Sequence, residues 1–175
     1  MFNNCNEKMF SLAGQTVDKY GLDKTGQINY TFDKHGFREG NDYAQKPDYV
    51  FFGASTLAGI GVIEQKRFSR YFDNSWNFGL CGTYIDEESI TNYNSFTKLK
   101  IDNAKIVFCW KNDNPVELLK LIKKLPKDVY HCVATKLDRE KTCLYPKNLD
   151  YDVSNTHWGP ITHEKFYKLL CYFLK

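Results

Sequence analysis

The chain has 175 residues, of which 42% are hydrophobic and 26% charged; this length and composition fit one soluble globular domain and leave little room for a second. The formal net charge of +3 is small and spread along the chain, which argues against the clustered basic surface of a nucleic-acid-binding protein. No apolar run approaches the roughly 18 residues of a membrane span, and residues 1–10 lack the apolar segment of a signal peptide, so we expect a cytoplasmic protein without a membrane partner.

Residues 1–46 are polar and rich in glycine, which predicts an N-terminal extension packed on the domain that follows. Within this extension we expect a short strand near residues 28–32. From Pro47 onward, short β-prone runs alternate with stretches of helical periodicity, so residues 47–175 form the predicted α/β domain. Its predicted strands are residues 48–52, 75–78, 106–110, 129–134 and 142–145. Its predicted helices are residues 59–72, 83–97, 116–125 and 160–174.

Strands that alternate with helices usually form a parallel sheet that is covered on both faces. The sequence therefore predicts an α/β fold with a central parallel sheet of about five strands. In such sheets, reacting groups and ligands lie beyond the carboxyl ends of the strands. The residues that directly follow each predicted strand are therefore the candidates for function.

Two side chains at such positions, and a third in the loop before the last helix, carry useful chemistry. Ser55 follows the first strand, behind Gly53, and the next helix would offer backbone N–H groups to an oxyanion; the same serine would also serve as an ordinary helix cap. Asn112 follows the third strand and could donate from its side-chain amide, although it also suits a simple turn. His157 lies in the loop before the last helix. Two other histidines are expected to be structural, His131 in the core and His163 in the core or at the surface.

Other motifs that follow a first strand do not fit this chain. A phosphate-binding loop needs Gly-Lys-Ser/Thr, which does not follow Gly53, and a dinucleotide fingerprint fails at Glu64. The Gly-x-Ser-x-Gly elbow of another hydrolase class fails at Leu57. A signalling domain with an acidic phospho-acceptor also fits poorly, because residues 53–61 contain no acid.

The cysteines give no sign of a metal centre. Six cysteines occur without a Cys-x-x-Cys pair and without a cluster of histidines nearby. Several lie inside apolar runs, which is typical of reduced, buried thiols. We therefore predict no metal and no cofactor.

Four short blocks, taken in order, resemble the SGNH or GDSL-like hydrolases. The Gly-Asp-Ser block is similar to residues 53–55 (Gly-Ala-Ser), and the Asn-x-Gly-x-x-Gly block to residues 77–82. The Gly-x-Asn-Asp block is similar to residues 110–113 (Trp-Lys-Asn-Asp). The last block, in which His precedes Gly-Pro and a helix, is similar to residues 157–163. With a similar leader at residues 32–38, the resemblance covers roughly residues 28–175, although its motifs are short.

The resemblance implies a three-layer α/β/α, flavodoxin-like fold and a serine hydrolase that cleaves a carboxylic ester. Ser55 would be the nucleophile, His157 its base and Asp152 the carboxylate that orients the base. The oxyanion hole would consist of Ser55, Gly82 and Asn112. The partner would be a small-molecule ester, with an acyl or acetyl group and an acylated carbohydrate among the candidates.

Three residues depart from the family pattern. Ala54 replaces an Asp, and Trp110 replaces a Gly, which predicts a crowded or reshaped oxyanion side. Ser154 stands three residues before His157, where the family has its Asp, so Asp152 would have to act from five residues before it. Without Asp152 the site would be a Ser–His dyad.

These departures keep a second interpretation open, an SGNH-like module that binds a carbohydrate or another small ligand without turnover. Three aromatic residues adjoin the proposed blocks, Tyr84, Trp110 and Trp158. They would suit a sugar ring or an acyl chain, but core packing explains them equally well.

Overall fold

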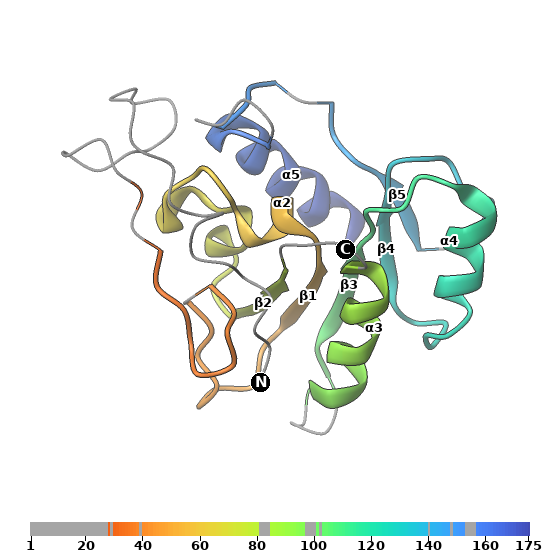
Figure 1. Cartoon of the computed structure of the whole chain (residues 1–175), viewed down its shortest axis with the longest axis horizontal. Coiled ribbons are helices and arrows are strands. Elements are labelled where there is room, and N and C mark those ends of the chain that lie inside the picture. The colour runs from red at the N-terminus through yellow and green to blue at the C-terminus, as the bar shows by residue number, and fades with distance from the viewer. Residues whose placement is uncertain are drawn as a thin grey trace.

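The structure of the chain is a computed structural model (Figure 1). It describes residues 28, 30–38, 40–80, 85–96, 101, 103–139, 141–147, 149–152 and 157–175. Among these residues, no helix combines the length and the apolar character that a membrane span requires.

A five-stranded, all-parallel sheet forms the centre of the domain. Its strands, in chain order, are β1 (Tyr49–Gly53), β2 (Ser75–Gly79), β3 (Lys105–Cys109), β4 (Tyr130–Val133) and β5 (Thr142–Leu144). Their order across the sheet is β2-β1-β3-β4-β5. The predicted α/β class and parallel sheet are confirmed, and the strands differ from the predicted ones only at their ends.

Four α-helices connect and cover the strands in the described part of the chain (Figure 1). They are α2 (Ser55–Ala58), α3 (Ile85–Phe96), α4 (Pro115–Ile122) and α5 (Pro160–Phe173). The start of α4 shows how the sequence sets such a boundary: Pro115 occupies the first turn, and the Asn114 side chain accepts hydrogen bonds from the N–H groups of Val116 and Glu117. The predicted helices at residues 83–97, 116–125 and 160–174 correspond to α3, α4 and α5.

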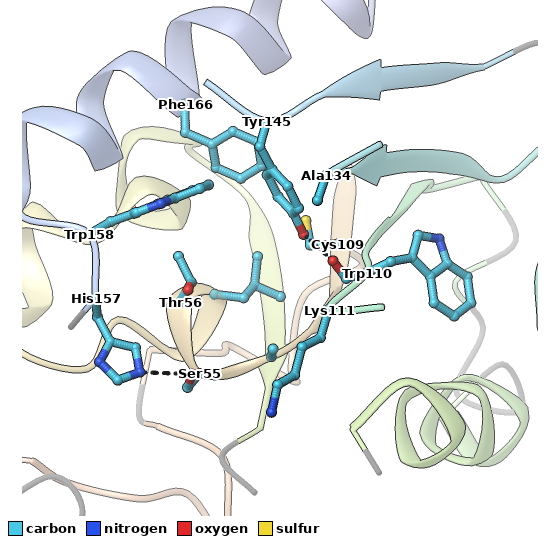
Figure 2. Close-up of a pocket in the computed structure, with 12 residues that line it drawn as sticks. Ser55, Thr56, Cys109, Trp110, Lys111, Ala134, Tyr145, His157, Trp158 and Phe166 are labelled. Carbon is cyan, nitrogen blue, oxygen red and sulfur yellow. Dashed lines mark hydrogen bonds between the residues drawn. The ribbon is translucent and has the colours of Figure 1, made fainter. Parts of the chain in front are cut away.

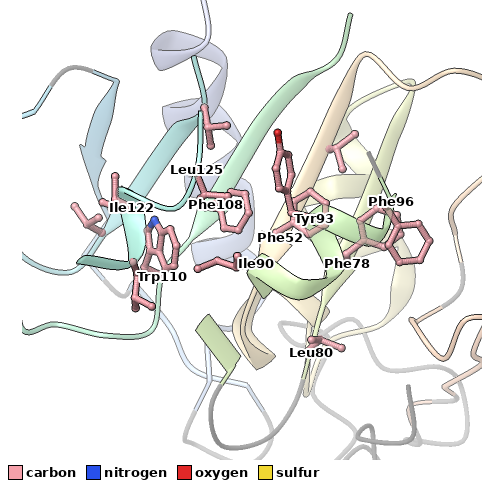
Figure 3. Close-up of a cluster of buried hydrophobic side chains, with 14 of the residues drawn as sticks. Phe52, Phe78, Leu80, Ile90, Tyr93, Phe96, Phe108, Trp110, Ile122 and Leu125 are labelled. Atoms are coloured by element: carbon pink, nitrogen blue, oxygen red, sulfur yellow. The ribbon is translucent and has the colours of Figure 1, made fainter. Parts of the chain in front are cut away.

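The two faces of the sheet form two separate cores, because successive side chains of a strand point to opposite faces. On one face, Phe52 and Phe108 stack with ring centroids 5.0 Å apart, and residues from α3 and α4 complete this cluster (Figure 3). On the other face, Phe51 packs with Phe166 and Leu170 of α5 in a second buried cluster. Helices therefore cover both faces.

The predicted helix at residues 59–72 is wrong. The helix begins earlier, at Ser55, and ends at Ala58, because Gly59 adopts the left-handed conformation (φ 74°) and its N–H bonds back to the carbonyls of Ser55 and Thr56. The chain then continues through two short 3₁₀ turns, η2 (Glu64–Lys66) and η3 (Phe68–Tyr71). Ile60, Val62, Phe68 and Phe72 of this stretch are buried, but on backbone that is not α-helical.

The predicted strand near residues 28–32 is also not present among the described residues. Phe32 forms only an isolated antiparallel bridge with Arg38. The described part of the predicted extension nevertheless packs on the domain, since Phe37 is fully buried in the first core. Arg38 is 2% exposed and donates hydrogen bonds to the carbonyls of Gly59 and Val62.

Candidate active site

Ser55 lies at the carboxyl end of β1, on the first residue of α2. The helix packs directly on the end of β2. Gly79 leaves the room for this contact, since a Cβ there would overlap the backbone of Ala58. Asn77 of β2 adds a buried side-chain hydrogen bond to the carbonyl of Leu57, at 2.9 Å. These contacts hold the short helix over the strand ends.

His157 contacts Ser55 from a segment 102 positions later in the chain. Its Nε2 lies 3.0 Å from Ser55 Oγ (Figure 2). An antiparallel bridge between Tyr151 and Trp158 brackets this segment, and the Asp152 N–H donates to the His157 carbonyl at 2.9 Å. The structure thus brings together the serine and the histidine that the sequence singled out.

Asp152 lies behind the imidazole and is fully buried. Its Oδ2 is 3.6 Å from His157 Nδ1, which is longer than a hydrogen bond, and its Oδ1 accepts the His157 backbone N–H at 3.2 Å. Gly61 packs against this carboxylate so closely that a Cβ there would overlap it. The carboxylate is therefore near the ring that the sequence assigned to it, at ion-pair distance.

The surroundings of His157 favour its neutral form. Burial lowers the pKa of His157, the carboxylate of Asp152 acts in the opposite direction, and the positive charge of Lys111 lowers the pKa further. A neutral imidazole can accept a proton, which is the state that a general base needs.

A cavity of about 310 Å³ opens beside Ser55, at the lower end of the range for small-molecule sites. Its polar side holds Ser55, His157 and Lys111, and its wall is mostly apolar and aromatic (Figure 2). The twelve lining residues are Ala54, Ser55, Thr56, Leu57, Cys109, Trp110, Lys111, Ala134, Tyr145, His157, Trp158 and Phe166.

Three rings form the aromatic wall, one just after β5 and two from α5 and the residues before it. The ring centroids of Tyr145 and Trp158 are 5.3 Å apart, and those of Trp158 and Phe166 are 5.1 Å apart. The Tyr145 hydroxyl donates to the Trp110 carbonyl at 3.0 Å, which fixes the ring at the end of β3. Such a wall can hold an acyl chain or a sugar ring.

Trp110 does not crowd the site, contrary to expectation. Its ring points away from Ser55 (Figure 2), is 1% exposed, and donates from Nε1 to His131 Nδ1 at 3.1 Å. The reason is the alternation along β3, which directs Trp110 to the same face as Phe108. Only the backbone side of Trp110 faces the cavity.

The Asp86 carboxylate holds the loop that follows β3. This carboxylate is 6% exposed and accepts the backbone N–H groups of Lys111 at 2.9 Å and Asn112 at 2.8 Å; burial raises its pKa, and these two hydrogen bonds act against that shift. Asn112 is not among the lining residues, and its Oδ1 accepts the N–H of Asn114 at 2.9 Å. The residue of this loop that reaches the cavity is Lys111.

Three residues named from the sequence, Tyr84, Gly82 and Ser154, lie outside the described residues. Of the predicted oxyanion donors, Ser55 therefore lies in the cavity and Asn112 lies in the adjoining loop.

Sequence reasoning did not identify Lys111, Tyr145, Phe166 or Arg38 as site residues. Lys111 directly follows the predicted strand 106–110, so the rule that selected Ser55 would also have selected it. Tyr145 was the last residue of its predicted strand, whereas β5 ends at Leu144 and leaves Tyr145 just beyond the strand. Phe166 lies on the apolar face of α5, where core packing and pocket lining give the same pattern. Arg38 gave no signal beyond its place in the leader.

Two further histidines lie in the core. His131 and His163 are both fully buried, and burial lowers the pKa of each to about 3. His131 is therefore the core histidine that its apolar strand predicted, and His163 is a structural residue of α5.

No cluster of three or more potential metal-ligating side chains (His, Cys, Asp or Glu) occurs among the described residues. Comparison with family models, with curated proteins and with solved structures found no match to this chain.

Proposed function

We propose that the chain is a serine hydrolase that cleaves a carboxylic ester, with Ser55 as nucleophile and His157 as base, on a flavodoxin-like fold of the SGNH type. The observation that carries the proposal is the 3.0 Å contact between Ser55 Oγ and His157 Nε2 at the edge of a cavity. A hydroxyl that donates to a neutral imidazole is the activated pair of nucleophilic catalysis.

The order of the strands supports the location of this site. The order β2-β1-β3-β4-β5 is that of flavodoxin-like sheets, whose ligands bind where the strand order reverses, between β1 and β3. Ser55 follows β1 and Lys111 follows β3, and both line the cavity. The cavity therefore lies where this class of sheet holds its ligands.

The proposed reaction has two halves. Ser55 Oγ attacks the ester carbonyl carbon while His157 Nε2 takes the hydroxyl proton. The tetrahedral intermediate then expels the alcohol, which receives this proton from His157, and the acyl group stays on Ser55. Water then attacks the acyl-enzyme while His157 takes one of its protons. The second tetrahedral intermediate expels Ser55 Oγ, which takes this proton back from His157, and the carboxylic acid is released. Asp152 stabilises the imidazolium that forms in each half.

The oxyanion of each intermediate needs hydrogen-bond donors. Because α2 begins at Ser55, the N–H of Ser55 is not used within the helix. Gly82 and Asn112 are the two further donors in the proposal. Loss of one such donor typically raises the barrier by about 2.7–4 kcal/mol.

Substitution of Ser55 tests the proposal. A fluorophosphonate probe should label the wild-type protein, and the protein should hydrolyse a short acyl ester such as p-nitrophenyl acetate. Ser55→Ala should lose both activities, because no other lining side chain pairs a hydroxyl with His157. Ser95→Ala is the matched control, since this serine lies exposed on α3 and outside the cavity. Labelling that persists in Ser55→Ala would refute the assignment.

A second candidate function is a small-ligand or carbohydrate-binding module without turnover. It is favoured by the 3.6 Å separation of Asp152 and His157 and by the aromatic wall of the cavity. Such a module would bind a sugar with the fold intact but would not react with the fluorophosphonate probe.

A further inference from the structure

Lys111 is the one lining residue with a full positive charge. None of the twelve residues that line the cavity is acidic, and His157 is held neutral. Figure 2 shows the Lys111 side chain extending from the end of β3 toward the Ser55 side of the cavity, with His157 on the other side of Ser55. Among the lining side chains the one full charge is thus the positive charge of Lys111, while the Asp152 carboxylate lies behind His157, 3.6 Å from its Nδ1.

The backbone from which this side chain extends is firmly fixed. The buried Asp86 carboxylate binds the N–H groups of both Lys111 and Asn112, and the Tyr145 hydroxyl binds the carbonyl of Trp110. The charge also acts across the site, since it contributes to the lowered pKa of His157. Lys111 thus acts electrostatically at the reacting atoms from a fixed base.

The proposed reaction assigns the two sides of Ser55 to different parts of an ester. His157 must protonate the leaving alcohol, so the alcohol oxygen has to lie on the His157 side. The acyl group then lies on the opposite side, toward Lys111. A cation at this position would attract and orient a negatively charged group on the acyl part.

Building on the proposed function, we infer that the preferred substrate is an ester whose acyl group carries a negative charge, such as a half-ester of a dicarboxylic acid, with the charge held by Lys111. The apolar wall of Tyr145, Trp158 and Phe166 contacts the uncharged remainder. Lys111 is then the residue that sets specificity for the acyl group.

A pair of esters that differ in one charge tests this inference. Monoethyl succinate carries a carboxylate where ethyl levulinate carries a neutral methyl ketone of similar shape. We expect the wild-type protein to prefer the succinate by about tenfold in kcat/KM. A tenfold preference lies between what an exposed ion pair and what a charged hydrogen bond typically contribute to binding. Ethanol release measures both rates. The preference should weaken as salt is added.

Substitution of Lys111 separates charge recognition from other roles. Lys111→Gln should abolish the preference, because kcat/KM for the succinate should fall about tenfold further than kcat/KM for the levulinate. Lys124→Gln removes the same charge from an exposed position after α4, outside the cavity, and should keep the preference. This control excludes an effect of net charge alone.

Two results would overturn the inference while the proposed function stands. One is a wild-type protein that reacts with the fluorophosphonate probe but cleaves the two esters equally well. The other is a Lys111→Gln variant that loses activity on both esters to the same extent, which would make Lys111 a general donor to the oxyanion. Absence of probe labelling would instead refute the hydrolase itself, and the inference with it.

Discussion

At the scale of single residues, neighbouring charges of opposite sign act on the pKa of His157. Burial and Lys111 lower its pKa, whereas Asp152 raises it. Its pKa therefore lies below the usual value of about 6.5. In the proposed reaction only the neutral ring acts as the base, so kcat/KM should be constant at neutral pH and fall as the pH drops below that value.

Two substitutions should move this acid limb in opposite directions. Lys111→Gln removes a positive charge and should shift the midpoint to higher pH. Asp152→Asn removes a negative charge and should shift the midpoint to lower pH, together with a large loss of kcat, since the imidazolium of the transition state is no longer stabilised. pH–rate profiles of the two variants measure both shifts. Midpoints that move in the same direction would contradict the effects assigned to the charges of Lys111 and Asp152.

The Ser55–His157 contact could be anticipated from residue positions, whereas the wall of the cavity could not. Ser55 follows from the rule that places reacting groups at strand ends, and His157 follows from the order of the four blocks that resemble the SGNH hydrolases. Tyr145 and Phe166 are ordinary aromatic residues in sequence, and only the fold brings their rings together at the cavity, with centroids 5.9 Å apart. Asp152 lies between these cases, because its closeness to the ring depends on the bridge between Tyr151 and Trp158.

At the scale of elements, the loop after α2 depends on a buried guanidinium. Arg38 donates to the carbonyls of Gly59 and Val62 and pairs with Glu64 at 3.1 Å. The same loop carries Gly61, which packs against Asp152. The described part of the N-terminal segment thus supports both α2 and the carboxylate behind His157.

Two arginines that share Glu64 as a partner provide a matched pair of variants. Arg38→Met should lower the free energy of unfolding by about 3 kcal/mol, because buried carbonyl groups lose their donors. Arg70 is 46% exposed and lies 3.5 Å from the same carboxylate, so Arg70→Met should change stability by less than about 1 kcal/mol. Denaturant unfolding measures both values, and equal losses would show that the buried contacts of Arg38 contribute nothing further.

Strands were easier to predict than the segment that follows Ser55. Each strand is a short apolar run between turn residues, and this local pattern is sufficient. Residues 59–72 also contain buried apolar side chains such as Ile60, Val62 and Phe68, but Gly59 and Gly61 adopt φ values of 74° and 79°. The left-handed backbone at both glycines interrupts the helix, and hydrophobic spacing does not reveal it.

At the scale of the whole molecule, two buried histidines link stability to pH. Nδ1 of His131 accepts the Trp110 indole N–H, and Nδ1 of His163 accepts the Phe68 backbone N–H. Both rings must therefore be neutral in the folded protein, which agrees with their pKa values of about 3. In the unfolded chain the pKa of each ring returns to about 6.5.

The sign of this linkage follows from which state binds protons first. Below about pH 6.5 the unfolded chain takes up protons that the folded protein does not, so the free energy of unfolding should fall as the pH drops from about 6.5 toward 3. At about pH 5, each histidine should cost about 2 kcal/mol. His163→Asn keeps an acceptor near the Phe68 N–H but cannot titrate, so this variant should lose less stability on acidification. Denaturant unfolding at several pH values measures the difference, and a slope equal to that of the wild type would contradict it.

The class of the fold was predictable because its signals are local and repeated. Five apolar runs that alternate with helical patterns are enough to indicate a parallel sheet, whatever their order across it. The order β2-β1-β3-β4-β5 depends on contacts between distant segments, and single elements carry little information about it.

The separation of Ser55 and His157 by 102 positions has a consequence for following the assembly of the domain. The serine belongs to the first βα unit and the histidine to the loop before the last helix, so a nascent chain or a partly folded intermediate that lacks docked α5 would contain an inert hydroxyl. If Ser55 is the nucleophile, as proposed, its covalent capture by a fluorophosphonate would report completion of the whole domain rather than formation of the sheet.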